Sequence, residues 1–162
     1  VKYSEDIIST GKTSDIAEYE DYITVDEEIN KINVNRYIGR TKINKTVEAN
    51  NMQFIINYVD VYKDNEIYDV KIKNLNNKEV ILDDLSSTQN TYMVTNKETK
   101  INCMNYEVIK GGFEYPAGMI KTVKFKFYKS YTTDIADKQL VFSAAKIIDG
   151  ENEETQTISI DL

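Results

Sequence analysis

Apolar and polar residues alternate with a period of two along most of the chain beyond residue 40. In the segments 68–73 and 157–162 the even positions are apolar, and the odd positions are polar or charged. Successive side chains of a β-strand point to opposite faces, so this alternation predicts strands with one face in the core and the other in water. The pattern therefore favours sheet over helix for this part of the chain.

The lysine-rich stretch KTVKFKFYKS obeys the same rule. Val123, Phe125 and Phe127 fall on one face, whereas Lys124 and Lys126 fall on the other. We interpret the stretch as a half-buried strand whose lysines face water and discourage edge-to-edge pairing. The alternative is a basic surface that binds a polyanion.

Turn-forming residues separate the alternating segments. They lie at 63–65, 76–77, 116–118 and 149–150, and they divide about 120 residues into about seven to nine short strands. Segment 54–62 is apolar at both parities, which predicts a central strand that is covered on both sides or bent by a bulge. Because almost no helical pattern accompanies these strands, we predict an all-β antiparallel sandwich.

The amino-terminal part of the chain is strongly acidic. The first 35 residues hold three lysines against nine aspartates and glutamates, a net charge of −6 out of −7 for the 162-residue chain. We therefore divide the chain into an acidic extension, 1–40, and a sandwich, 41–162. The stretch TVDE, Thr24–Glu27, has the spacing of a helical capping box. The extension is thus an extended leader or linker, a short docked helix, or an acidic docking surface.

Charge and composition exclude several classes of protein. Nucleic acid and anionic lipid are bound largely through basic clusters, so the acidic extension argues against both partners. No apolar run reaches the about 18 residues that a membrane span needs. The chain has no histidine, which removes Ser-His-acid, Cys-His and imidazole metal sites. Cys103 is the only cysteine, so it forms no intramolecular disulfide, and we expect it to be a strand residue.

Carboxylates are the remaining candidates for a chemical site. Asp60, Asp64, Glu66 and Asp69 lie around one predicted hairpin turn, and oxygen ligands from neighbouring loops can hold calcium. The spacing does not match the helix-loop-helix calcium signature. The competing interpretation is that these acidic side chains are simply solvated.

Tyrosines are the main candidates for contact with a partner. The chain has twelve tyrosines and no tryptophan, and amphipathic rings form good contact surfaces for protein or glycan. The alternative is that they complete the rim of the core with their hydroxyl groups in water. The five that we expect near one end of the sandwich are Tyr92, Tyr106, Tyr115, Tyr128 and Tyr131.

Four segments between residues 46 and 148 carry a family resemblance. They read VKIKNLNNKEVILDDLS, TYMVTNKETK, GGFEYPAGMIKTVKFKFYKSY and KQLVFSAAKI. Their order resembles the immunoglobulin-like extracellular domain that is widespread in lipoproteins and surface proteins of Gram-positive bacteria. In that pattern the turn at Pro116 and Gly118 precedes a phenylalanine-containing strand, and the strand around Leu140–Phe142 closes the core. The resemblance implies an immunoglobulin-like fold and contains no catalytic motif.

The resemblance also implies a function and a location. It implies a non-enzymatic binding or adhesion module of a surface-exposed or secreted lipoprotein, with a protein or cell-wall glycan as partner and no cofactor. The acidic extension would then be a tether, and a lipid anchor would lie in a part that precedes Val1. Two alternatives stay open. One is a proteinase-inhibitor or accessory domain of an envelope complex, using the loop Ser86–Thr91 or Lys110–Tyr115, and the other is a calcium- or glycan-binding module.

Overall fold

The computed structural model describes residues 35–95, 99–108, 112–128 and 138–162. Within these ranges the unit from Tyr37 to Leu162 consists of strands and contains no helix, and no apolar helix long enough to span a membrane occurs there. The strands are β1 (Tyr37–Ala49), β2 (Met52–Tyr62), β3 (Asn65–Asn74), β4 (Glu79–Ile81), β5 (Thr91–Thr95), β6 (Thr99–Val108), β7 (Glu114–Tyr115), β8 (Ile120–Tyr128), β9 (Lys138–Asp149) and β10 (Asn152–Asp161).

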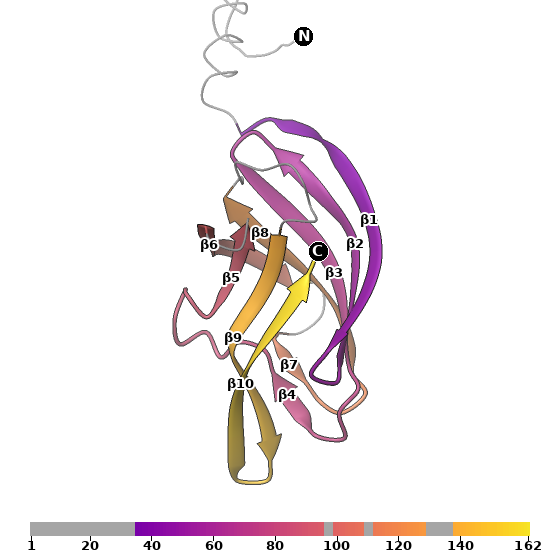
Figure 1. Cartoon of the computed structure of the whole chain (residues 1–162), viewed down its shortest axis with the longest axis vertical. Coiled ribbons are helices and arrows are strands. Elements are labelled where there is room, and N and C mark those ends of the chain that lie inside the picture. The colour runs from indigo at the N-terminus through magenta and orange to yellow at the C-terminus, as the bar shows by residue number, and fades with distance from the viewer. Residues whose placement is uncertain (1–34, 96–98, 109–111, 129–137) are drawn as a thin grey trace, which may run out of the picture. The chain divides into compact units, whose positions relative to one another are not determined.

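The strands form two antiparallel sheets that share one strand (Figure 1). The first sheet has the order β1-β2-β3-β8-β6, and the second contains β5, β9, β10, β4 and β7 around β9. The beginning of β6 pairs with β5, and its end pairs with β8. The predicted all-β antiparallel sandwich is confirmed. The ten strands exceed the expected number because β4 and β7 are only three and two residues long.

The core lies between the sheets and is centred on aromatic rings from both. Phe142 of β9 stacks on Phe54 of β2 with the ring centroids 5.8 Å apart, and it meets Phe125 of β8 edge-on at the same distance. Such aromatic pairs add stabilisation beyond the burial of their surface. In β8, Val123, Phe125 and Phe127 are fully buried, so the alternation in this segment is confirmed.

Lys124 and Lys126 of β8 lie on the outer face of the first sheet, whereas Lys121 has the parity of the core-facing residues and its Nζ donates to the backbone oxygen of Glu114. In the strand ladder Lys124 is opposite Asp69 on one side and Glu107 on the other. Oppositely charged cross-strand neighbours stabilise a sheet modestly. This register supports the interpretation of the lysine-rich stretch as scaffold.

The long apolar segment in β2 contains a bulge. The pairing of β2 with β3 shifts register between Ile56 and Tyr58. Before the shift Phe54 and Ile56 face the core, and after it Val59 does. The extra residue reverses which parity points inward, so the predicted bulge is confirmed.

The sheet begins earlier than predicted. β1 starts at Tyr37, so residues 37–40 belong to the sandwich and not to the acidic extension. The prediction was wrong here because β1 is a largely exposed edge strand without a clear apolar alternation. Residues 1–34 of the extension, including Thr24–Glu27, lie outside the described residues.

Candidate functional site

The outer face of the first sheet carries a group of aromatic side chains around a fixed arginine. We call this group the aromatic face and define it as Tyr37, Arg40, Tyr58, Tyr62 and Tyr128. The bulge in β2 places Tyr58 and Tyr62 on the side opposite to the buried Val59. Tyr128 follows the buried Phe127 in β8 and therefore faces outward as well.

Arg40 is held in one position by two neighbours. Its Nε donates a hydrogen bond to Asp60 Oδ1 at 2.7 Å, and its Nη2 donates to Oδ2 at 3.0 Å. The guanidinium carbon lies 3.6 Å from the centre of the Tyr58 ring, which is a cation–π arrangement. The hydrogen bond to Asp60 raises the pKa of Arg40 above its ordinary value, so the guanidinium stays charged. The forked, planar geometry of arginine suits this paired contact.

The tyrosines extend this arrangement toward the start of β1 and the end of β8. Tyr37 meets Tyr62 edge-on with the ring centroids 5.3 Å apart. Tyr128 pairs with Asn65, which directly follows the turn after Tyr62. Tyr37 and Tyr128 remain 51% and 59% exposed. The Tyr37 ring is held by Tyr62 and therefore loses little conformational entropy on binding, so it can contact a partner at low cost.

The predicted calcium ligands do not come together. Asp60 binds Arg40, and Asp69 accepts a hydrogen bond from Asn57 Nδ2 at 2.7 Å. Glu66 points into the core, whereas Asp64 lies in the turn between β2 and β3. No group of three or more acidic or cysteine side chains suited to a metal occurs in the described part of the chain. Alternation along β2 and β3 places Asp60 and Asp69 on the outer face and Glu66 on the inner face, so the carboxylates do not converge.

Glu66 instead belongs to a buried ionic group that joins the two sheets. Lys138 Nζ of β9 donates to Glu66 Oε1 at 2.9 Å and to the Tyr68 hydroxyl oxygen at 3.1 Å. The Tyr68 hydroxyl donates in turn to Glu66 Oε1 at 2.9 Å. The side chains of Lys138 and Glu66 are only 2% and 6% exposed. Burial, with the charge of Glu66 beside it, raises the pKa of Tyr68 and keeps its hydroxyl protonated.

The five predicted partner-binding tyrosines do not form one cluster in the described residues. Tyr115 is fully buried, which makes it a core residue, and burial raises its pKa. Tyr92 lies in the second sheet beneath Lys100, whose Nζ is 3.9 Å from the ring centre. Tyr128 belongs to the aromatic face. The backbone of Tyr106 lies in β6, but its side chain is not described, and Tyr131 lies outside the described residues.

The loop after β4, which contains the first predicted inhibitory segment, Ser86–Thr91, is fixed by side-chain hydrogen bonds. The carboxylate of Asp83 accepts hydrogen bonds from the backbone N–H of Leu85 at 2.8 Å and from the Thr91 hydroxyl at 2.6 Å. Leu85 has a positive φ of 63° and is 58% exposed. A non-glycine residue in this region is strained, so its neighbours must hold it there. The other predicted loop, Lys110–Tyr115, does not protrude at its carboxyl-terminal end, because Phe113 and Tyr115 are buried.

The same loop predicts a dependence of stability on acid pH. Hydrogen bonds from Ser86, with the Lys146 ammonium 3.0 Å away, hold the pKa of Asp84 well below its ordinary value of 3.8. Because the pKa of Asp84 is lower in the folded than in the unfolded protein, the ionised carboxylate stabilises the fold at pH values above the unfolded pKa. This contribution is lost progressively as the pH falls below the unfolded pKa. We expect the free energy of unfolding, measured with urea, to fall less between pH 5 and pH 2.5 in Asp84→Asn than in the unaltered protein. Equal losses would contradict this assignment.

Comparisons with known proteins give only distant structural likenesses. No protein-family model matches the chain, and no curated protein matches it significantly. A solved structure of a functionally unknown protein from Listeria monocytogenes is similar with a TM-score of 0.40 and 11% identity, over 76% of this chain and 83% of that one. An uncharacterized beta-sandwich protein from Clostridium difficile is similar with a TM-score of 0.34 and 15% identity, over 71% and 90%. The fold assignment therefore rests on the strands of this chain themselves.

Proposed function

We propose that the protein is a non-enzymatic binding or adhesion module that contacts a protein or a cell-wall glycan through the aromatic face. The observation that carries this proposal is that the exposed Tyr37 and Tyr128 share the outer face of one sheet with Arg40, which Asp60 and Tyr58 already hold in place. Aromatic rings and arginine are the side chains most often responsible for binding energy at interfaces. A partner would meet a surface that needs little rearrangement.

The location of the module is part of the same proposal. The resemblance to immunoglobulin-like domains of Gram-positive lipoproteins supports an extracellular site, at the cell surface or in a secreted protein. The residues that carry it lie in structural positions that such a domain needs, since Pro116 and Gly118 form the turn before β8 and Leu140–Phe142 lies in the core strand β9. A lipid anchor in a preceding part of the protein would fit this arrangement.

A proteinase-inhibitor role is the second candidate, and the loop after β4 favours it. Besides the contacts of Asp83, Asn90 donates from Nδ2 to Asp84 Oδ1 at 3.3 Å, and the backbone oxygen of Asn90 accepts bonds from Ser143. A protease can bind a rigid loop with an exposed leucine tightly, because such a loop loses little conformational entropy on binding. Inhibition assays with a panel of serine and cysteine proteases test this candidate, and Leu85→Ala should abolish any inhibition observed.

The aromatic face makes a direct prediction for binding. The full chain is incubated with purified cell-wall sacculi of a Gram-positive bacterium, and the bound fraction is measured by sedimentation. We expect the pair of changes Tyr37→Ser and Tyr128→Ser to weaken binding at least about tenfold, which corresponds to about 1.4 kcal/mol. Both side chains are exposed, so the substitutions should leave thermal unfolding almost unchanged.

Tyr92→Ser provides the matched control, because Tyr92 lies in the second sheet and outside the aromatic face. Equal weakening by this variant would show that the aromatic face is not the binding surface. If the unaltered chain does not bind sacculi, the glycan partner is excluded, and capture of surface proteins with the same variants becomes the test.

A further inference from the structure

Two of the long strands of the sandwich have one unpaired edge each, as does the two-residue strand β7. Among the described strands β1 pairs only with β2, and β10 pairs only with β9. The two strands are 13 and 10 residues long, and most of their residues are exposed. An exposed edge presents unpaired backbone N–H and C=O groups, which makes it a template for another strand.

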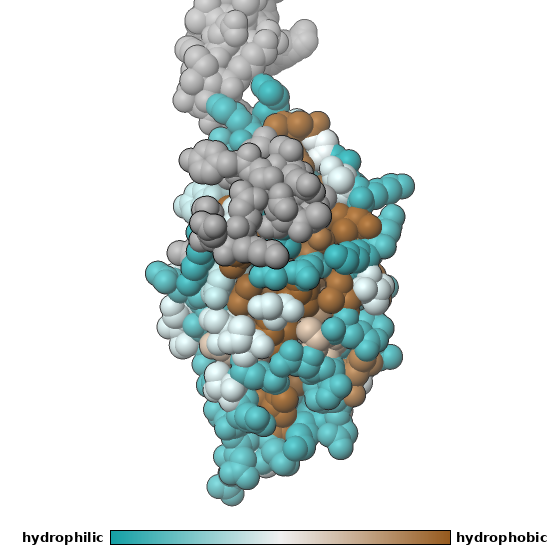
Figure 2. All heavy atoms as spheres, in the orientation of Figure 1, coloured by the Kyte–Doolittle hydropathy of each residue, from teal (hydrophilic) through white to brown (hydrophobic). Residues whose placement is uncertain are grey.

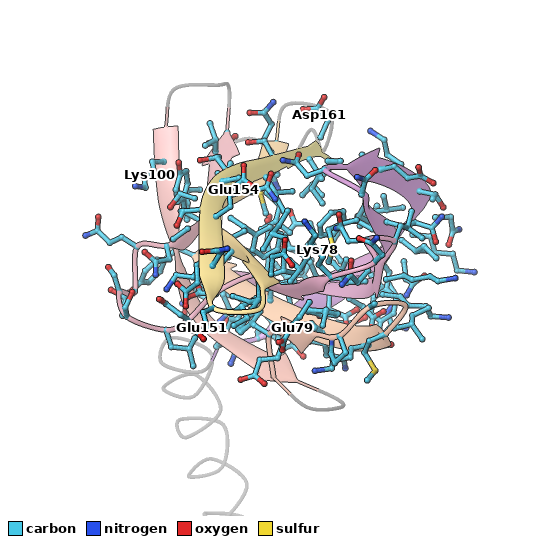
Figure 3. All side chains as sticks on the ribbon, turned by 90° about the horizontal axis from the view of Figure 1, so that it is seen from below. Lys78, Glu79, Lys100, Glu151, Glu154 and Asp161 are labelled. Carbon is cyan, nitrogen blue, oxygen red and sulfur yellow. The ribbon has the colours of Figure 1, made fainter. Side chains whose placement is uncertain are left out.

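The two edges carry opposite charges. β1 has three basic residues and one acid, whereas β10 has three acids and no basic residue. These residues are Arg40, Lys42, Lys45 and Glu48 in β1, and Glu153, Glu154 and Asp161 in β10. Figure 3 shows Glu154 and Asp161 on β10. Figure 2 shows that the end of the molecule formed by the β9–β10 hairpin is hydrophilic.

Only some of the charged side chains on these two edges form ion pairs within the described part of the chain. Arg40 binds Asp60, and Glu153 lies 3.5 Å from Lys146. Lys42, Lys45 and Glu154 make no ion pair with any residue that the structure describes. Where the two strands come near each other, Asn50, which directly follows β1, donates a neutral hydrogen bond from Nδ2 to Gln156 Oε1 at 2.6 Å. Opposite charges are thus available for an outside partner on both edges.

We propose that the β1 edge of one copy pairs with the β10 edge of a second copy. Like charges oppose pairing of either edge with itself, because β1 would bring lysines against lysines and β10 would bring carboxylates against carboxylates. Each of these pairings would satisfy backbone groups on both strands, but only the mixed pairing also joins opposite charges. Strand addition of this kind derives its affinity from main-chain hydrogen bonds and its selectivity from side chains.

The geometry of this contact determines the kind of assembly. The two edges are different surfaces, so the contact is head-to-tail, and each added copy again leaves one β1 edge and one β10 edge open. The product is a linear chain of copies, or a ring if the rotation closes. The bulge in β1 between Lys42 and Lys45 interrupts the regular edge, which limits the paired stretch and makes the association weak and dependent on concentration.

Sedimentation velocity of the full chain over a wide range of concentrations tests the proposal. We expect the average mass to rise with concentration at low salt, and to rise less at 0.5 M NaCl because salt screens exposed charges. The variant Lys42→Glu with Lys45→Glu and the variant Glu153→Lys with Glu154→Lys should each associate at least tenfold more weakly. A mixture of the two variants should associate again, because each acidic β1 edge then meets a basic β10 edge.

The matched control is Lys71→Glu with Lys73→Glu, which changes the net charge equally on β3, a strand paired on both sides. This variant should associate as the unaltered protein does. Circular dichroism establishes that each variant is folded. A protein that stays monomeric at every concentration, or a mixture that fails to associate, would overturn the proposal. Equal weakening by the control would show a net-charge effect rather than strand pairing.

Discussion

Replacing Lys138 by methionine is expected to lower the free energy of unfolding by about 3–5 kcal/mol, because the change leaves the buried Glu66 carboxylate without its counter-charge. Replacing Glu66 by leucine should have a similar effect, since among the described residues it leaves the buried ammonium with only the Tyr68 hydroxyl as a hydrogen-bond partner. Urea unfolding followed by circular dichroism measures both changes.

The double variant Glu66→Leu with Lys138→Met distinguishes the effect of the ion pair on stability from the effect of burying two side chains of this size. Replacing a buried ion pair by apolar residues of similar volume is often neutral or stabilising. We therefore expect the double variant to be more stable than either single variant. The exposed pair Lys78–Asp149, with side chains 44% and 65% exposed, supplies the control, and Lys78→Met should cost less than about 1 kcal/mol. A loss below 1 kcal/mol in Lys138→Met would contradict the assigned role.

The second large effect is expected at Asn74, which is fully buried at the end of β3. Its Nδ2 donates to the backbone oxygens of Lys78 at 2.8 Å and Tyr115 at 2.7 Å, and its Oδ1 accepts the backbone N–H of Asn76 at 2.8 Å. One side chain thus connects the turn after β3 to β7. Asn74→Ala leaves these backbone groups without partners, at a cost of about 1–3 kcal/mol for each group that stays buried.

We expect Asn74→Ala to destabilise the protein by about 3 kcal/mol, as measured by urea unfolding. Asn77→Ala is the matched control, because Asn77 lies in the same turn and is exposed, and it should change stability by less than about 0.5 kcal/mol. A similar small change in both variants would mean that water replaces the lost hydrogen bonds of Asn74.

The parity of β3 in the sequence also indicates one member of the buried ionic group. Glu66 has the same parity as Tyr68, Val70 and Ile72, which face the core. Parity alone therefore indicates an inward-facing carboxylate and argues against a calcium ligand at this position. Its partner is 72 residues away in the chain, and no local pattern identifies a contact over that separation. The ion pair could be suspected from the sequence, but its second member could not.

The aromatic face was missed for a different reason. Continued alternation from Phe54 and Ile56 would place Tyr58 in the core, but the bulge in β2 turns it outward beside Arg40. A single inserted residue reverses the face of every side chain that follows. Tyr115 was misassigned because β7 is too short for its pattern to be recognised, although pairing with β4 buries it completely.

The sequence by itself determined the strands, the turns and the sandwich class, because alternation with a period of two is a local property that each segment carries alone. It also determined the acidity of the amino-terminal part and the absence of histidine chemistry. Tertiary structure decided which strands pair, which charges are buried and which tyrosines share a face. Those outcomes depend on contacts that no single segment contains. The packing of the two sheets brings Lys138 to Glu66, and the pairing of β1 with β2 brings Arg40 to Asp60.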